Sequence, residues 1–91
     1  RGRRFKEKEP LDIRIIAYYP IPQSTSKKRR KEMLEHRIRP TVKPDLDNVA
    51  KLIYDALNGV AWYDDNAIVD TQVRKFYSDT PRVDVFIRAV E

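Results

Sequence analysis

The sequence contains no cysteine and only one histidine, and these two shortages remove whole classes of site. Without cysteine the chain cannot form a disulfide scaffold, a thiolate zinc site or a cysteine nucleophile. The single histidine, His36, argues against histidine-based metal sites and against Ser-His-Asp chemistry. Any chemistry in this chain must therefore come mainly from carboxylates and lysine.

Long apolar runs are also missing. Runs such as residues 15–19 fall far short of the roughly 20 residues that cross a membrane. No positively charged start is followed by an apolar stretch, which is the pattern of a signal peptide. We therefore expect no membrane partner, and the absence of cysteine fits a cytoplasmic protein. No small-molecule substrate is expected either.

The length of 91 residues predicts a single domain, residues 1–91, with a small hydrophobic core. Apolar residues make up 41% of the chain and charged residues 36%. This composition is apolar enough to fold, yet polar enough to expect support from a metal, a partner or a second copy.

The charges are divided unevenly along the chain. Residues 1–43 carry a net charge of +9 and residues 44–91 a net charge of −4, which together give the overall +5. A basic half indicates a polyanionic partner, and an acidic half suits that partner only if its carboxylates hold a divalent cation. Charges placed on opposite faces merely for solubility explain the same division equally well.

Hydrophobic periodicity predicts one helix and three strands. Residues 11–19, 67–77 and 82–90 alternate as strands, and residues 46–58 carry an apolar stripe at helical spacing. Because only four residues join the last two strands, we expect these strands to pair as an antiparallel hairpin. The order β-α-β-β predicts an α+β fold, with the helix packed on a mixed or antiparallel sheet.

Two further segments lack a clear period. Residues 1–9 are basic and polar, and are expected to be a tail. Residues 20–43 have few apolar positions, so we expect a mobile basic loop that includes one helical turn. The centre of this loop is the run Lys27, Lys28, Arg29, Arg30 and Lys31. Such a run contacts DNA phosphates in one interpretation and is a solvated linker in the other.

Carboxylates and one lysine form the candidate chemical site. Asp45 and Asp47 stand where the chain enters the predicted helix, and Lys51 follows Asp47 by one helical turn. Oxygen ligands of this kind suit Mg²⁺. A further carboxylate, Asp64 or Asp65, would complete a metal site if the next strand started beside the helix N-terminus. In the alternative interpretation these aspartates are helix caps and turn residues, and Lys51 is solvated.

Three sequence segments together resemble the RusA family of Holliday junction resolvases. They read Lys-Pro-Asp-Leu-Asp-Asn-Val-Ala-Lys from residue 43, Asp-Ala-Leu-Asn-Gly from residue 55 and Trp-Tyr-Asp-Asp-Asn-Ala-Ile-Val from residue 62. The resemblance implies a homodimeric, Mg²⁺-dependent endonuclease of bacterial or phage origin, with Mn²⁺ as a substitute cation. Its expected substrate is four-way junction DNA, nicked symmetrically in two strands. The resemblance also implies that the chain lacks part of the family's N-terminal region.

Carried over by position, Asp45, Asp47 and Asp65 resemble the family's metal-binding catalytic aspartates, and Lys51 resembles its essential lysine. The expected DNA-binding residues are Lys27, Lys28, Arg29, Arg30, Lys31, Lys43 and Lys75. Trp62 and Tyr63 are expected in the core or at an interface. Two other functions fit the same residues: a non-catalytic basic nucleic-acid-binding module, and a nuclease for other branched DNA.

Overall fold

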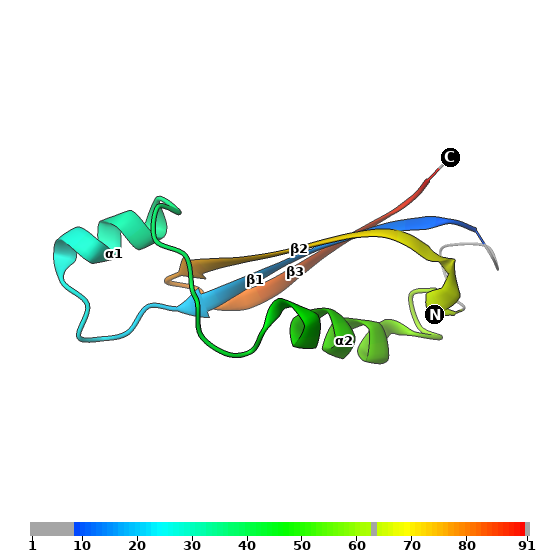
Figure 1. Cartoon of the computed structure of the whole chain (residues 1–91), viewed down its shortest axis with the longest axis horizontal. Helices are drawn as coiled ribbons and strands as arrows, with labels where there is room; N and C mark the ends of the chain where they lie inside the picture. Colours follow the sequence, from blue (N-terminus) through cyan, green and yellow to red (C-terminus); the bar gives the residue numbers. More distant parts are fainter. Residues whose placement is uncertain (1–8, 63, 91) are drawn as a thin grey trace.

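The computed structural model describes residues 9–62 and 64–90, so the expectations for Tyr63 and for most of the N-terminal tail lie outside the described residues. The elements follow in the order β1 (Leu11–Pro20), α1 (Lys27–Leu34), α2 (Leu46–Leu57), the 3₁₀ turn η1 (Asp65–Ala67), β2 (Ile68–Ser78) and β3 (Arg82–Ala89). The strands form a mixed three-stranded sheet (Figure 1). The predicted α+β fold class is confirmed.

β1 is the central strand, because β2 pairs with it in parallel and β3 pairs with it antiparallel. Its odd-numbered side chains point to one face, and Leu11, Ile13 and Ile15 are completely buried there. A strand covered along both edges and on one face provides the most apolar position in a small sheet, which explains why this strand has the strongest alternation in the chain.

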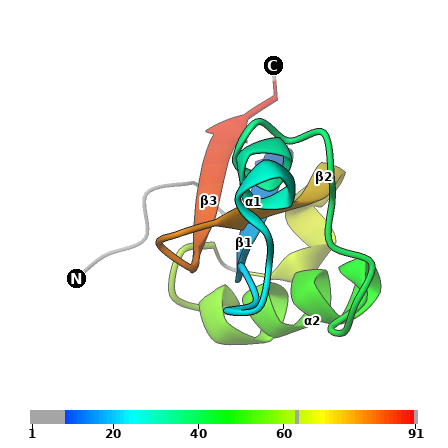
Figure 2. The same ribbon diagram turned by 90° about the vertical axis from the view of Figure 1, so that its left-hand side faces the viewer.

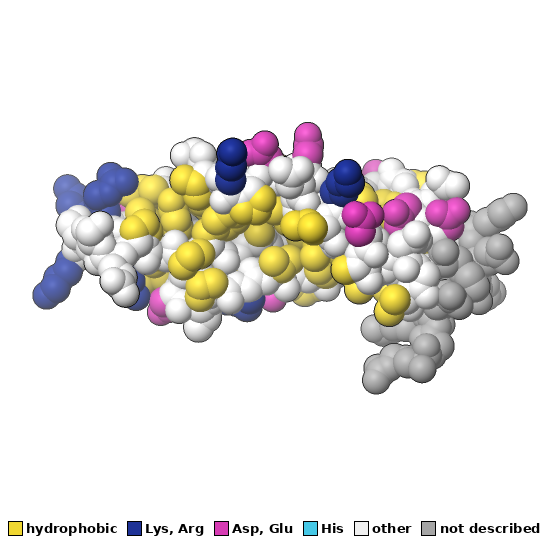
Figure 3. All heavy atoms as spheres, turned by 90° about the horizontal axis from the view of Figure 1, so that it is seen from below, with side chains coloured by type: hydrophobic (Ala, Val, Ile, Leu, Met, Phe, Trp, Pro, Cys, Tyr) yellow, Lys and Arg dark blue, Asp and Glu magenta, His cyan; other side chains and the backbone are white. Residues whose placement is uncertain are grey.

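α2 covers that buried face, as Figure 2 shows from the end of the sheet. Val49 is buried against the strand residues, and Ile53 and Leu57 pack beside it. Only part of the apolar stripe predicted for α2 packs against the sheet. Leu52 belongs to this stripe but is 64% exposed. Seen from the α2 side, apolar side chains gather in a band over the middle of the molecule (Figure 3).

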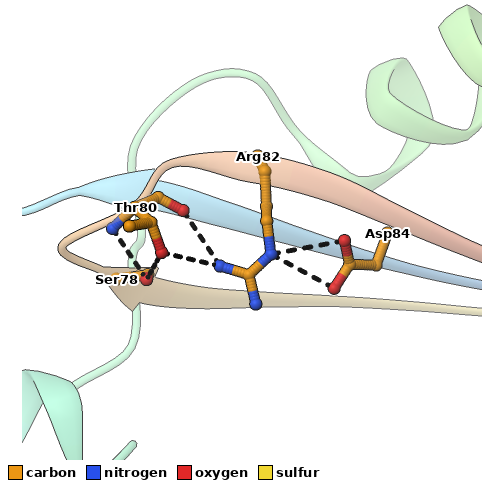
Figure 4. Close-up of polar contacts among 4 residues, drawn as sticks. All are labelled: Ser78, Thr80, Arg82 and Asp84. Carbon is orange, nitrogen blue, oxygen red and sulfur yellow. Dashed lines mark hydrogen bonds and ion pairs between the residues drawn. The ribbon is translucent and has the colours of Figure 1, made fainter.

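The predicted hairpin between the last two strands is wrong, because β1 lies between β2 and β3. Two strand spacings amount to about 10 Å, and an extended link from Ser78 to Arg82 spans up to roughly 13 Å. The link therefore crosses the end of β1. Figure 4 shows how it is held: Arg82 Nη1 donates to the carbonyl and hydroxyl oxygens of Thr80 at 3.0 and 2.9 Å, and Arg82 Nε contacts Asp84.

The basic run is a helix rather than the loop predicted for it. α1 contains all five of its cationic residues, and Ser26 caps the N-terminus by accepting a hydrogen bond from the Arg29 amide. Lysine and arginine favour helix because their long unbranched side chains lose little rotamer freedom there. Met33 is the buried residue of this helix. One buried position gives no apolar period, so the helix left no periodic signal in the sequence.

No helix in residues 9–62 and 64–90 combines the length and the apolar character that crossing a membrane requires.

Tyr19, near the end of β1, ties the sheet to the segment that leads into α2. Its hydroxyl group donates to the Pro44 carbonyl oxygen at 2.6 Å. Burial raises the pKa of Tyr19 above its ordinary value of 10.0, and the negative charge of Asp45 raises this pKa further. The neutral phenol is therefore the form that folding favours.

Replacing Tyr19 with phenylalanine should lower the free energy of unfolding by about 0.5–1.5 kcal/mol at pH 7, because the bond to Pro44 disappears. Because the folded-state pKa is raised, the wild-type stabilisation is complete below pH 10 and falls as the pH rises through the folded-state pKa. The difference between the two proteins should therefore shrink above pH 10. Urea unfolding of both proteins between pH 7 and 11 measures this, and a constant difference would contradict it.

Candidate functional site

Two candidate carboxylates lie at the start of α2 with their oxygen atoms uncommitted. Asp45 occupies the N-cap position, yet its side chain makes no capping hydrogen bond. Asp47 lies in the first turn. Both residues are exposed, and neither has an ion-pair or hydrogen-bond partner for its side chain among the described residues. The capping interpretation of Asp45 therefore lacks the contact that would support it.

Lys51 follows Asp47 by four residues in α2, so helical geometry places both on one face. Lys51 is exposed and forms no ion pair with Asp47 among the described residues. The start of α2 thus presents two free carboxylates with a free ammonium group one turn away, beside the partial positive charge of the helix N-terminus.

The later pair of aspartates divides into two different environments. Asp64 is exposed and serves locally: its Oδ1 accepts from the Asn66 amide at 3.5 Å, and its Oδ2 accepts from Asn66 Nδ2 at 3.2 Å. Asp65 is half-buried and contacts a core residue instead. Trp62 Nε1 donates to Asp65 Oδ1 at 2.7 Å. Trp62 is 1% exposed and so belongs to the core. The core was one of the two locations expected for it, the other being an interface.

The condition under which a third carboxylate would join Asp45 and Asp47 within one chain is not met. It required β2 to begin beside the start of α2, but β2 begins with Ile68 paired to Leu11, whereas Pro44 contacts Tyr19 near the other end of β1. Asp65 therefore lies past the C-terminal end of α2, a helix of 12 residues and thus roughly 18 Å long (Figure 1). Among the residues that the structure describes, no three acidic or histidine side chains come together.

The donor set nevertheless fits a hard divalent cation. Mg²⁺ in proteins is usually held by one or two carboxylates, with water and substrate phosphate filling the remaining positions. Asp45 and Asp47 supply such a pair without giving up any side-chain contact that the structure shows. A chain without cysteine and with one histidine offers no softer alternative.

Most of the predicted DNA-binding residues are exposed, but one of them already contacts other parts of the chain. Lys27, Lys28, Arg29, Arg30 and Lys31 are all exposed on α1, and Lys43 is exposed before α2. Lys75 on β2 is half-buried instead: its Nζ donates to the Val42 carbonyl oxygen at 2.6 Å and lies 5.0 Å from the centre of the Tyr19 ring. Lys75 thus anchors the segment before α2.

A stack of rings and guanidinium groups, which sequence reasoning missed, fixes the segment after α1. The Phe76 ring on β2 has His36 at 4.3 Å, the Arg39 guanidinium at 4.0 Å and Tyr18 at 6.2 Å from its centre. Arg39 Nε also donates to the Lys75 carbonyl oxygen at 2.7 Å. His36 is exposed but packs on this ring. The available signal was Tyr18 and Phe76 at outward-facing strand positions.

This stack lies on the face of the sheet opposite α2, because Tyr18 alternates with the buried residues of β1 and is paired with Phe76. It brings α1 to the end of the strands (Figure 2). The basic helix is therefore attached to the sheet through the residues that follow it. The cationic side chains of α1 therefore have a defined position relative to the sheet, unlike those of a solvated linker.

Comparison with known proteins places these features in a family. A family model described as Endodeoxyribonuclease RusA matches residues 1–88. The chain is also 45% identical over 83 residues to a Bacillus subtilis (strain 168) protein named Uncharacterized protein YqaN, covering 89% of this chain and 58% of the relative. The chain thus spans less than two thirds of that relative's length. No solved structure matches the chain.

Replacing Phe76 with alanine should loosen α1 without unfolding the sheet. The ring contacts that this change removes are worth about 1–2 kcal/mol in total, which corresponds to roughly tenfold faster local opening. The amides of His36 and Arg37, which donate to the Met33 and Glu32 carbonyl oxygens, report this directly in hydrogen exchange.

Phe86→Ala is the matched control, since Phe86 is also an outward-facing strand phenylalanine but is 56% exposed. It should leave exchange at the end of α1 unchanged. Equal exchange rates at these amides in the Phe76 and Phe86 variants would show that the stack does not hold the helix.

Proposed function

Because the chain belongs to the RusA endodeoxyribonuclease family, we propose that it is part of a Mg²⁺-dependent nuclease that resolves four-way DNA junctions by paired nicks. The observation that carries the proposal is the pair of carboxylates at the start of α2. Asp45 is the N-cap residue but makes no capping hydrogen bond, and neither Asp45 nor Asp47 has a side-chain partner among the described residues. A family of DNA nucleases gives those carboxylates a role, and Mg²⁺, or Mn²⁺ in its place, matches their chemistry. We also propose a cytoplasmic location and a bacterial or phage origin, as the resemblance to the family implies.

Each residue has a distinct task in the proposed reaction. Asp45, Asp47 and Asp65 hold the cation, which when bound supplies an activated water and neutralises phosphate charge. The Lys51 ammonium group, on the Asp47 face of α2, stabilises the negative charge that develops on the scissile phosphate. The cationic side chains of α1 bind the DNA backbone and set its position without reading its sequence.

A second copy of the chain completes the proposed cation site. One chain separates Asp65 from Asp45 and Asp47 by about the length of α2, roughly 18 Å. A two-fold axis perpendicular to the middle of α2 sets two such helices antiparallel, and Asp65 of one copy then approaches the aspartate pair of the other. The same axis gives two equivalent sites, as paired nicks in a four-way junction require.

The apolar band on the α2 side supports this assembly (Figure 3). A groove of about 300 Å³ lies between α2 and the ends of β1 and β3, and Leu52 and Val83 on its walls are 64% and 47% exposed. Exposed apolar side chains gathered along one face are typical of protein interfaces. A homodimer formed through this face would bury them and would bring the two α2 helices together.

The first test is subunit complementation between Asp47→Asn and Asp65→Asn. Each variant alone should bind junctions but fail to nick them, because one ligand of every site is removed. In a mixed dimer one site loses two ligands while the other keeps all three. After co-refolding, the mixture should therefore regain about a quarter of wild-type nicking, with single nicks and few resolved duplexes.

Sedimentation equilibrium of the wild-type chain, and its melting temperature with and without Mg²⁺, accompany this assay. A dimer whose melting temperature rises with Mg²⁺ agrees with the proposal. Full activity in either single variant would remove that aspartate from the site. A mixture that stays inactive would place each site within one chain, and a folded protein that gains no stability from Mg²⁺ would favour the non-catalytic binding module.

A second test concerns α1. Replacing its five cationic residues, 27–31, with alanine should weaken junction binding. It should also flatten the dependence of log affinity on log salt by up to about 0.9 for each DNA phosphate that the helix no longer neutralises. Alanine is a strong helix former, so the helix itself is kept. Gel-shift titrations between 50 and 300 mM salt measure the slope, and a panel of flapped and three-way DNA tests the preference for four-way junctions.

The paired variant Glu32→Gln/Glu35→Gln provides the control, at one position in α1 and at its C-cap residue. It removes negative charge beside the cationic residues and should keep or steepen the salt slope. If the alanine variant and this control have the same slope as the wild-type protein, α1 does not contact DNA.

A further inference from the structure

Trp62, the only tryptophan in the chain, joins the C-terminal end of α2 to the turn that carries Asp65. Its ring is buried with the core and lies edge-on to Tyr54, with centres 6.4 Å apart. Its backbone is fixed as well: the Trp62 carbonyl oxygen accepts from the Gly59 amide at 2.7 Å. Gly59 has φ = +77°, a conformation that glycine adopts readily as the chain leaves a helix. The indole is therefore held on both its ring and its main chain.

The indole N–H is a donor with no acceptor capacity, and burial requires that it find a partner. That partner is Asp65 Oδ1 at 2.7 Å. The bond uses one carboxylate oxygen and leaves Asp65 Oδ2 without a hydrogen bond to any described residue. Asp64, next to it in the chain, has both oxygens engaged by Asn66. A cation ligand requires a carboxylate that is held in place and still has a free oxygen atom. Asp65 meets this requirement, whereas Asp64 does not.

We propose that Trp62 is a positioning residue for the cation site: its indole N–H fixes the Asp65 carboxylate so that the second oxygen is available to a divalent cation. This inference rests on the proposed function, because it assumes that Asp65 is a ligand. A hydrogen bond to one oxygen restricts rotation of the carboxylate. Partners of this kind orient metal ligands in many sites, and their removal typically costs about 10–100-fold in affinity.

A competing explanation is that Asp65 exists only to satisfy the buried indole. The two explanations separate in Asp65→Asn, because the amide oxygen can still accept from Trp62 while the negative charge is removed. A purely structural Asp65 predicts that this variant keeps both its stability and its Mg²⁺ affinity. A ligand held by Trp62 predicts a stable protein that binds Mg²⁺ much more weakly.

The main experiment compares Mg²⁺ affinity, measured by calorimetry, in the wild-type chain, Trp62→Phe and Asp65→Asn. Trp62→Phe keeps an aromatic ring but removes the N–H, and its affinity should fall about 10–100-fold. Ile15→Val is the control for core damage, since Ile15 is completely buried in β1 and pairs with Val73, well along β2 from the turn that carries Asp65. It should retain wild-type affinity.

The emission of Trp62 itself provides a measurement that needs no variant of this residue. Because the indole N–H is bonded to one oxygen of the carboxylate whose other oxygen would bind the cation, Mg²⁺ binding should shift the wild-type emission with the same midpoint as the calorimetric titration. Mg²⁺ is diamagnetic, so the shift reports the altered hydrogen bond and not paramagnetic quenching. The emission of Asp65→Asn should not change over that concentration range. This measurement keeps the inference testable if Trp62→Phe fails to fold.

The outcomes distinguish the inference from the function on which it rests. If Asp65→Asn loses Mg²⁺ affinity while Trp62→Phe keeps it, Asp65 is a ligand but Trp62 does not position it, and the inference is overturned. Wild-type emission that stays constant at saturating Mg²⁺ overturns it as well. If Asp65→Asn binds Mg²⁺ like the wild-type chain, the role proposed for Asp65 itself fails.

Discussion

The burial of one face of β1 beneath α2 is the interaction on which the rest of this domain depends. Leu11, Ile13 and Ile15 are fully buried there, and each such side chain contributes about 1.5–3 kcal/mol relative to exposure. The most apolar strand takes the central position, so the link from β2 to β3 must cross its end. α2 must lie lengthwise to cover it, and this places the two ends of the helix, with their carboxylates, far apart. The core therefore sets the geometry of the candidate site.

The sequence predicted the elements whose patterns are long and regular. β1, β2, β3 and α2 agree with their predicted ranges to within one residue at each end, because burial on one face imposes a period on the residues. Strand order was not predictable in this way. A short link shows only that the ends of β2 and β3 are near each other, whereas the most apolar strand, β1, takes the place between them. α1 was missed for a related reason. Its helix is supported by long cationic side chains, the Ser26 cap and one buried methionine, and none of these produces a period.

For the candidate site, the sequence identified residue types and spacing, whereas their arrangement depended on the fold. Asp45, Asp47 and Lys51 are close in sequence, so helical geometry alone relates them. The relation of Asp65 to them required the direction of β2, which residue spacing does not contain. The bond between Trp62 and Asp65 spans only three residues, yet it becomes meaningful once Trp62 is known to be buried. The stack on Phe76 joins residues about 40 positions apart, at outward-facing positions where strand periodicity predicts only exposure.

On the proposed assembly, cation binding and dimerisation must influence each other. A single chain offers the cation two carboxylates, whereas a dimer offers three, so the cation binds the dimer more tightly and stabilises it to the same extent. Without the cation, the same contact brings three negative charges together, and their repulsion opposes the burial of Leu52 and Val83. The apolar face and the acidic site thus act in opposite directions until a cation is present. A lone subunit would then hold its cation weakly and nick poorly, and nicking would be confined to paired subunits, which is the condition for cutting both strands of one junction.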